Sequence, residues 1–375
     1  MKKEKHEVFC GVDVIMKKGI AIQGKCGLIT NHTGVLKDLS ATTAEVLQKK
    51  CDLCALFGPE HGLYGAIQAG AETGEYMIDK QTGLPVYSLY GKGKMKAEAV
   101  LAGLDAVFFD MQDVGARFYT YAYTMTDAMA LCAKHGIRFI VLDRPNPIGG
   151  LKAEGTILDR RFATSVGRFP TATRSGLTIG EFALLANETE NIGCDLSVIA
   201  CEGWKREMDF DDTDLIFVAP SPNLPTVDAA FCYIGTCIFE GTNVSEGRGT
   251  TKPFETIGAP WLDAEAVLSL IGEQAGVRLR KTVFVPTFSK YAGVACEGIS
   301  LHITDRDAFL PFTVGIRLLE AIRKTHKELE ITPFMKSLIG TDAIFSPDFD
   351  AEAWMAREAE KVARWQRMTE KIYIY

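Results

Sequence analysis

The sequence predicts an α/β fold, with a doubly wound, mostly parallel sheet followed by a smaller α+β domain. Two observations support this prediction. Apolar runs alternate with amphipathic stretches through the first half of the chain, as strands alternate with helices in such folds. The apolar runs are continuous rather than interrupted at every second residue, which is typical of parallel strands covered on both faces.

Each element of the first half follows from its own residues. Apolar runs predict strands at 25–30, 51–57, 84–90, 105–111, 137–142 and 195–200. Amphipathic segments predict helices at 42–50, 97–102, 121–134 and 179–190. We expect Ser40 to cap the first helix, and Gly136 to end the third as its C-terminal cap.

The second half has a different composition, rich in Gly, Pro, Thr and Asn. We therefore divide the chain into an α/β domain, 1–205, and a smaller auxiliary α+β domain, 206–375. In the smaller domain, helices are expected at 264–274, 310–324 and 351–371, and strands at 283–286 and 298–303.

Composition excludes several classes of protein. The 375 residues are 47% hydrophobic and 24% charged, so collagen, a coiled coil and a disordered chain are excluded. The net charge of -7 and the absence of a basic run argue against a nucleic-acid partner. No apolar stretch approaches the ~18 residues of a membrane span.

The ten cysteines mostly lie in apolar runs, where a free cysteine is a small buried hydrophobe. Cys51-x-x-Cys54 has no second pair at zinc spacing, so we interpret it as structural. The N-terminal residues show no apolar core of a signal peptide. We therefore expect a cytoplasmic protein, with a secreted protein expressed without its signal as the alternative.

Polar side chains gather where the predicted strands end. The carboxyl ends of parallel strands meet at one edge of a sheet, and ligands bind in the crevice outside them. Turn formation accounts for glycines and prolines there, but it explains His, Glu and Arg poorly. The residues concerned are Asn31, His32, Glu60, His61, Asp110, Asp113, Arg117, Tyr119, Arg144 and Asn146. A glycine-rich loop in the second half adds Glu240, Asn243, Glu246 and Arg248.

These residue types favour acid–base chemistry. The glycine fingerprints of nucleotide sites, the GxSxG nucleophile elbow and the HExxH zinc motif are all missing from the sequence. Several carboxylates remain, and glycoside hydrolysis needs two of them across a sugar ring. A metal-dependent hydrolase that uses His32, His61 and Asp110 is an alternative.

The same segments resemble the bacterial exo-β-N-acetylmuramidase family. The motifs LITNHTG, LFGPEHGLYG, LDAVFFDMQDVGARFYTY, VLDRPNPIGG, FEGTNVSEGRGTTKPFETIGAPW and PTFSKYAG occur in that order, and the resemblance runs from about Gly11 to the end. It implies a Rossmann-like domain and an auxiliary domain with the cleft between them. It also implies release of N-acetylmuramic acid (MurNAc) from the non-reducing end of peptidoglycan fragments such as MurNAc–GlcNAc, without a cofactor.

The resemblance suggests roles for the polar residues. We expect Glu60 to be the general acid and Glu246 to be the second carboxylate, with Asp113 and Glu240 as rivals for that second role. The arginines are candidates for the lactyl carboxylate of MurNAc, and the amides and His32 for its hydroxyl or N-acetyl groups. These candidates are Arg117, Arg144 and Arg248, and Asn31, His32, Asn146 and Asn243, respectively. His61, Asp110 and Tyr119 complete the expected substrate-binding set. A muropeptide-binding or sensor module without catalysis is the second alternative.

Overall fold

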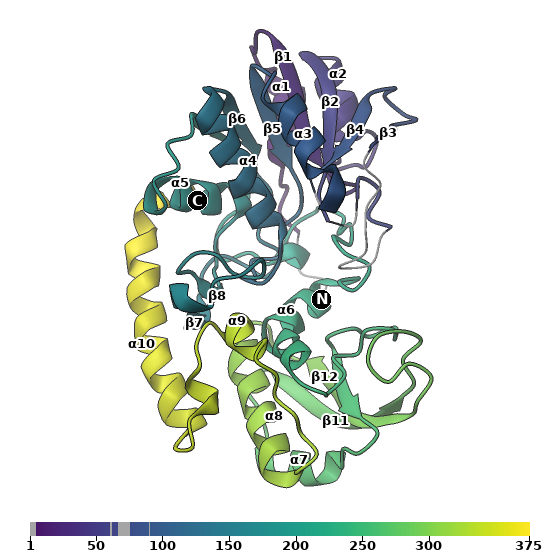
Figure 1. Cartoon of the computed structure of the whole chain (residues 1–375), viewed down its shortest axis with the longest axis vertical. Coiled ribbons are helices and arrows are strands. Elements are labelled where there is room, and N and C mark those ends of the chain that lie inside the picture. Colours follow the sequence, from purple (N-terminus) through teal and green to yellow (C-terminus); the bar gives the residue numbers. More distant parts are fainter. Residues whose placement is uncertain (1–4, 61, 67–75, 90) are drawn as a thin grey trace.

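A seven-stranded sheet forms the larger part of the protein (Figure 1). The computed structural model describes residues 5–60, 62–66, 76–89 and 91–375. In spatial order the strands are β3 (Tyr76–Ile78), β4 (Pro85–Ser88), β2 (Asp52–Gly58), β1 (Lys25–Thr30), β5 (Ala106–Asp110), β6 (Arg138–Leu142) and β9 (Leu196–Ile199). All neighbouring strands pair in parallel except β3, which runs antiparallel to β4 at one edge. The α/β fold class and the mostly parallel sheet are confirmed.

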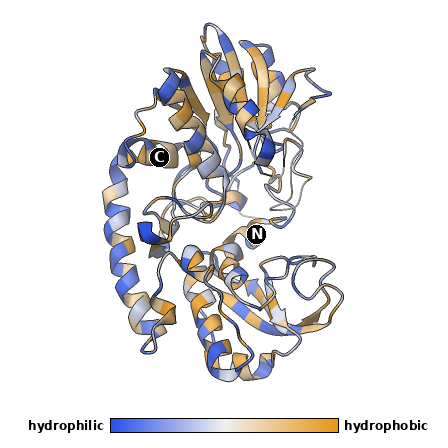
Figure 2. Ribbon diagram, viewed as in Figure 1, coloured by the Kyte–Doolittle hydropathy of each residue, from blue (hydrophilic) through white to orange (hydrophobic). Residues whose placement is uncertain are grey.

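The parallel pairing brings the predicted polar strand ends to one edge of the sheet. β5 is buried along its whole length, and so is β1 after its first residue. Figure 2 shows these strands as a largely hydrophobic layer between helices. Buried strands of this kind carry their polar groups only where they end, so Asn31 and the residues after Asp110 stand side by side.

Five helices accompany the sheet: α1 (Gly11–Lys18), α2 (Thr43–Gln48), α3 (Lys94–Leu101), α4 (Tyr121–His135) and α5 (Ile179–Thr189). Gly136 ends α4 in the left-handed conformation, with φ 67°, as predicted. The predicted Ser40 cap of α2 is wrong. The cap is Thr42, whose hydroxyl accepts from the Glu45 amide, while the Ser40 hydroxyl donates to Asp38.

The smaller part contains an antiparallel sheet in the order β10 (Thr256–Ala259), β12 (Cys296–Ile303), β11 (Val277–Phe284). Its helices are α6 (Val227–Thr236), α7 (Ala264–Ile271), α8 (Pro311–Thr325) and α9 (Met335–Ile339). The predicted strand 283–286 overlaps only the last two residues of β11. Charged and apolar residues alternate along this half-exposed strand, so it lacks the continuous apolar run by which the other strands were recognised.

The C-terminal helix connects the two parts. α10 (Ala351–Thr369) packs against α8 and against the small hairpin of β7 (Glu154–Ile157) and β8 (Ala172–Arg174). In Figure 1 it runs along one flank toward α5. The chain ends there, and the Tyr375 hydroxyl donates to the Asp143 carboxylate at 2.8 Å.

The ten cysteines are all free in this structure, and eight of them are buried. In the described part of the chain, we find no helix that is both long and apolar enough to cross a membrane.

Candidate active site

Asn31 organises the centre of the sheet edge. Its Nδ2 donates to the Tyr121 hydroxyl at 2.9 Å, and its Oδ1 accepts from the Thr33 amide at 3.0 Å. The hydroxyls of Tyr121 and Tyr119 both donate to the carbonyl oxygen of Pro220, at 2.8 and 3.0 Å. A segment beyond β9 is thereby held against the end of β1, and Asn31 and Tyr119 both contact Tyr121.

Glu60 and His32 lie at the ends of the neighbouring strands β2 and β1. The Thr120 hydroxyl, just before α4, donates to Glu60 Oε2 at 2.7 Å. His32 Nε2 lies 2.7 Å from the Ala219 carbonyl oxygen. Gly65 approaches so closely that a Cβ there would lie 2.0 Å from the His32 ring, so this position requires glycine. His61 is outside the described residues.

Asp113 is the acid with the most unusual surroundings. Its Oδ2 accepts from the Gly115 amide at 2.7 Å, which fixes the turn after β5. Its Oδ1 is buried and has no hydrogen-bond partner among the described residues. Loss of water raises the pKa of the Asp113 carboxyl to about 7. Burial also raises the pKa of the Tyr121 hydroxyl, and Glu60 and Asp113 both add to that rise. The two carboxylates therefore lie within electrostatic reach of one hydroxyl.

Asp110 and Arg144 form a closed, buried ion pair. Arg144 Nε and Nη2 donate to the two Asp110 carboxylate oxygens at 2.5 and 2.9 Å, and Thr43 donates to the same carboxylate. Burial acts to lower the pKa of the guanidinium, but the Asp110 charge outweighs it and the pKa is raised. Because the carboxylate and the guanidinium are bonded to each other, neither is readily available to bind a sugar or a metal ion.

Arg117 and Asn146 are held by the protein framework. Arg117 donates to the carbonyl oxygens of Thr156, Thr171 and Leu338, and burial lowers its pKa to about 10. Asn146 donates to the Leu177 carbonyl oxygen at 2.8 Å. Their substrate-binding roles stay predictions, and the structure gives both side chains contacts that shape loops.

The glycine-rich loop of the second half forms its own charged network. Arg248 Nη2 lies 2.7 Å from Glu240, and Arg248 Nε lies 3.3 Å from Glu246. Lys290 Nζ lies 3.1 Å from the second oxygen of Glu246. Asn243 points elsewhere, because its amide bonds the backbone of Glu328 and Glu330.

A series of aromatic rings connects the two clusters. Tyr119 packs on Tyr121 at 4.7 Å and on Tyr233 at 6.3 Å between ring centroids. Tyr233 packs on Phe254 at 4.6 Å, and the Arg248 guanidinium lies 4.9 Å from that ring. The carboxylates of both halves therefore border one continuous region of the protein.

Sequence reasoning gave no role to Thr120 or Lys290, although each contacts a predicted carboxylate. Both residues stand inside the quoted motifs, Thr120 in GARFYTY and Lys290 in PTFSKYAG. Membership of those motifs was the available signal, and only the fold shows which acid each residue touches.

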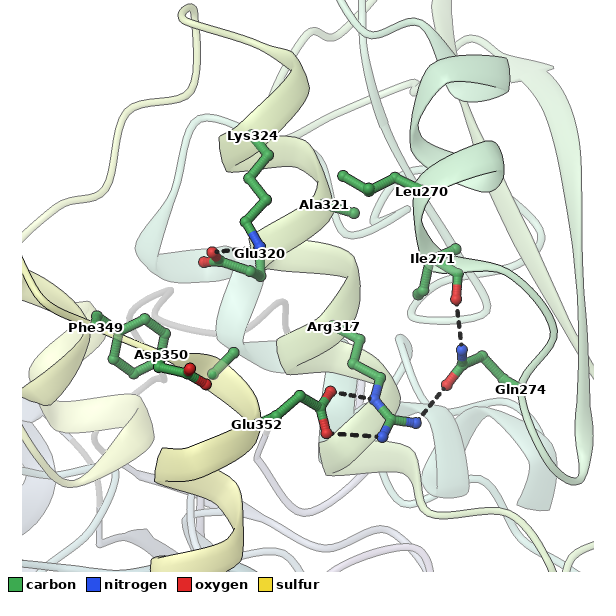
Figure 3. A pocket seen from close by; sticks show the side chains of 11 residues that line it. Leu270, Ile271, Gln274, Arg317, Glu320, Ala321, Lys324, Phe349, Asp350 and Glu352 are labelled. Atoms are coloured by element: carbon green, nitrogen blue, oxygen red, sulfur yellow. Dashed lines mark hydrogen bonds and ion pairs between the residues drawn. The ribbon is translucent and has the colours of Figure 1, made fainter.

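Of two cavities in the described part of the chain, one is lined by a predicted site residue. A cavity of about 620 Å³ lies between α7, α8 and the start of α10, far along the chain from the sheet edge (Figure 3). Its most prominent polar contact is the Arg317–Glu352 pair, drawn with both carboxylate oxygens on the guanidinium. A second cavity, of about 210 Å³, is lined by Glu60 and Thr120 and lies against α3 and α4.

No group of three or more His, Cys, Asp or Glu side chains in the described ranges could hold a metal ion. Of the alternative metal ligands, Asp110 is bound to Arg144 and His32 faces the Ala219 carbonyl oxygen.

Two models of one protein family together match most of the chain. The N-terminal model of exo-β-N-acetylmuramidase NamZ matches residues 26–228, and the C-terminal model matches residues 231–375. The chain is 48% identical over 333 residues to the peptidoglycan β-N-acetylmuramidase NamZ of Bacillus subtilis, covering 87% of this chain and 80% of that protein.

Two crystal structures of DUF1343 family proteins from Bacteroides fragilis share the fold. Their TM-scores are 0.88 and 0.78, at 31% and 28% identity, and each comparison covers 98% of this chain and 99% of the other. The chain belongs to the NamZ family of exo-β-N-acetylmuramidases and is a glycosidase.

Proposed function

We propose that this glycosidase releases MurNAc from the non-reducing end of peptidoglycan fragments, with Asp113 as the general acid and Glu60 as the opposing carboxylate. One observation carries the assignment: Asp113 Oδ1 is buried with no hydrogen-bond partner among the described residues, and Asp113 and Glu60 both act electrostatically on Tyr121. The relative from Bacillus subtilis supports the substrate class.

The pKa of Asp113 supports the acid role. A general acid works best when its pKa lies close to the working pH, because it is then protonated and still able to release its proton. With a pKa of about 7, Asp113 meets this condition near neutrality. The sequence alone suggested Glu60 for this role, and we reassign it on that ground.

The position of Glu60 supports its role as the carboxylate opposite the general acid. It follows β2, which neighbours β1 on one side, whereas Asp113 follows β5 on the other. A sugar ring above Asn31 and Tyr121 would have one carboxylate on each side, which is the arrangement that glycoside hydrolysis requires. Glu246 is less suited, because Lys290 and Arg248 both contact its carboxylate.

The test is the pH dependence of MurNAc release from MurNAc–GlcNAc. We expect kcat/KM to fall above a pKa of about 7, since the acid then loses its proton, and we expect Asp113→Asn to abolish that limb. Asp110→Asn is unsuitable as a control because it breaks a buried ion pair, so exposed Asp159→Asn serves instead. If kcat/KM of Asp113→Asn still falls above the same pH, another group is the general acid.

The anomer of the released MurNAc, followed by NMR, completes the test. A product of a single anomeric form is expected from two fixed carboxylates. GlcNAc release without free MurNAc, or binding of the disaccharide without any cleavage, would contradict the proposed activity and favour a binding module.

A further inference from the structure

The cavity beside Glu60 contains a cluster of charges that the proposed reaction does not use. It extends between α3 and α4, and Ser165 and Arg168 also line it. Besides Glu60, its charged lining groups are Lys94, Glu98, Asp127 and Arg168. At ~30 Å³ for each water molecule, about 210 Å³ holds on the order of seven waters, which is ample for a three-carbon acid group.

Three of these groups form one cluster, the Lys94–Asp127–Arg168 cluster. Arg168 Nη1 pairs with one Asp127 oxygen, and Lys94 Nζ lies 3.3 Å from the other. One carboxylate thus stands between two cations, so the cluster itself carries one excess positive charge, while Glu60 and Glu98 supply the other charges of the lining. The side chains of Lys94, Asp127 and Arg168 are 46%, 37% and 35% exposed, so a solute can reach them.

Arg168 is well prepared to bind an anion. The Tyr123 ring lies 5.7 Å from its guanidinium, and Asp127 engages only one of its three nitrogens among the described contacts. A guanidinium binds carboxylates through two parallel hydrogen bonds, and the Nε and Nη2 edge remains for a second carboxylate.

The other candidate arginines are committed elsewhere. Arg117 bonds backbone carbonyls, Arg144 clasps Asp110, and Arg248 bridges Glu240 and Glu246. Arg168 is also the one that shares a cavity with Glu60.

We propose that Arg168, assisted by Lys94, binds the lactyl carboxylate of the muramoyl residue, and that Asp127 positions both cations. The inference rests on the proposed function, because it places the sugar with its glycosidic bond near Glu60. The lactyl carboxylate is the group that distinguishes MurNAc from N-acetylglucosamine, so Arg168 determines specificity in this family member.

The experiment compares two chromogenic substrates, the 4-nitrophenyl β-glycoside of MurNAc and the same glycoside with its lactyl group as carboxamide. The wild type should prefer the carboxylate by roughly 10- to 100-fold, the range of a charged hydrogen bond. Arg168→Gln should lose about that factor in kcat/KM on the carboxylate, mainly through KM, and less than about 3-fold on the carboxamide.

Arg160→Gln is the matched control. Arg160 pairs with Glu190 on the surface, with a side chain that is 58% exposed, and its replacement should leave both substrates unchanged. Equal losses on the two substrates in Arg168→Gln would show a structural role and overturn the inference, as would a wild type that does not distinguish them.

Calorimetry separates this inference from the proposed function. Glu60→Gln should hydrolyse both glycosides at least about 10²-fold more slowly but still bind free MurNAc at least about 10-fold more tightly than its lactyl carboxamide. Adding Arg168→Gln should remove that preference. If the wild type cleaves neither glycoside, the proposed function fails. In that case the role of Arg168 is judged from calorimetry only. If free MurNAc then binds no more tightly than its lactyl carboxamide, the inference is overturned.

Discussion

Two pairs of carboxylates border the same aromatic region, and they differ in the charges beside them. Glu240 and Glu246 share Arg248, and Lys290 adds a second cation to Glu246. Asp113 has a turn amide for one oxygen and no partner for the other among the described residues. Burial raises the pKa of Asp113 to about 7, although the backbone amides of Gly115 and Val114 act to lower it.

The comparison suggests which buried acid is suited to proton transfer. It is the one whose pKa is raised by burial and that has no cation beside it. At Glu240 the Arg248 charge acts to lower the pKa, but burial outweighs it and the pKa is raised. A buried acid without a cation beside it retains its proton to higher pH and can deliver it. The Glu240–Glu246 network resembles a structural clamp, whereas the Glu60–Asp113 pair resembles the two-carboxylate machinery of a glycosidase.

The largest expected effect is a difference in kcat between a substitution in the Glu60–Asp113 pair and one in the Glu240–Glu246 pair. Glu60→Gln should lower kcat on MurNAc–GlcNAc by about 10²- to 10⁴-fold, because it removes a carboxylate from the proposed reacting centre. Glu240→Gln, measured per folded molecule, should lower kcat by less than about 10-fold. The reverse order of losses would place the chemistry at the second cluster.

The next effect is a difference in the free energy of unfolding between substitutions in the two pairs. Glu246→Gln leaves the Arg248 and Lys290 charges without their shared acid, so we expect a loss of about 3 kcal/mol in the free energy of unfolding. Urea denaturation measures it. Glu60→Gln weakens the hydrogen bond from the Thr120 hydroxyl and should cost about 1 kcal/mol, so equal losses would contradict the comparison.

A smaller effect should appear in the pH dependence of stability. The unfolded Asp113 releases its proton near its ordinary pKa of 3.8, whereas the folded form keeps the proton to about 7. The native state therefore binds more protons between these values, and the wild type loses stability relative to Asp113→Asn as pH rises from about 4 to 7. Thermal unfolding of both proteins across this range measures the difference, and parallel curves would contradict the raised pKa.

The smallest effect should come from the cavity shown in Figure 3. Glu352→Gln breaks an exposed ion pair with Arg317, which typically contributes less than about 1 kcal/mol. Urea denaturation should show that small loss, with kcat and KM on MurNAc–GlcNAc unchanged. A large fall in activity would mean that the cavity between α7, α8 and α10, rather than the cavity beside Glu60, belongs to the reaction.

Local patterns predicted the larger sheet well and the smaller one poorly. Strands such as β5 and β6 are continuous apolar runs between turn residues, and both were expected within a residue or two of their bounds. β11 alternates charged and apolar residues over its first half, and no helix was predicted where α6 lies. Their packing against β12 and α8 stabilises them, and a local pattern does not contain that information.

The sequence by itself determined that the chain is an α/β protein of the muramidase family and that its acids, amides and arginines gather where strands end. Periodicity, turn residues and motifs are local properties, so one chain suffices to recognise them. Only the tertiary structure decided which acid has a counter-charge. Lys290 reaches Glu246 across 44 positions and Thr120 reaches Glu60 across 60, while nothing charged reaches Oδ1 of Asp113 among the described residues. Electrostatic interaction depends on distance in space and on access of water, and folding sets both.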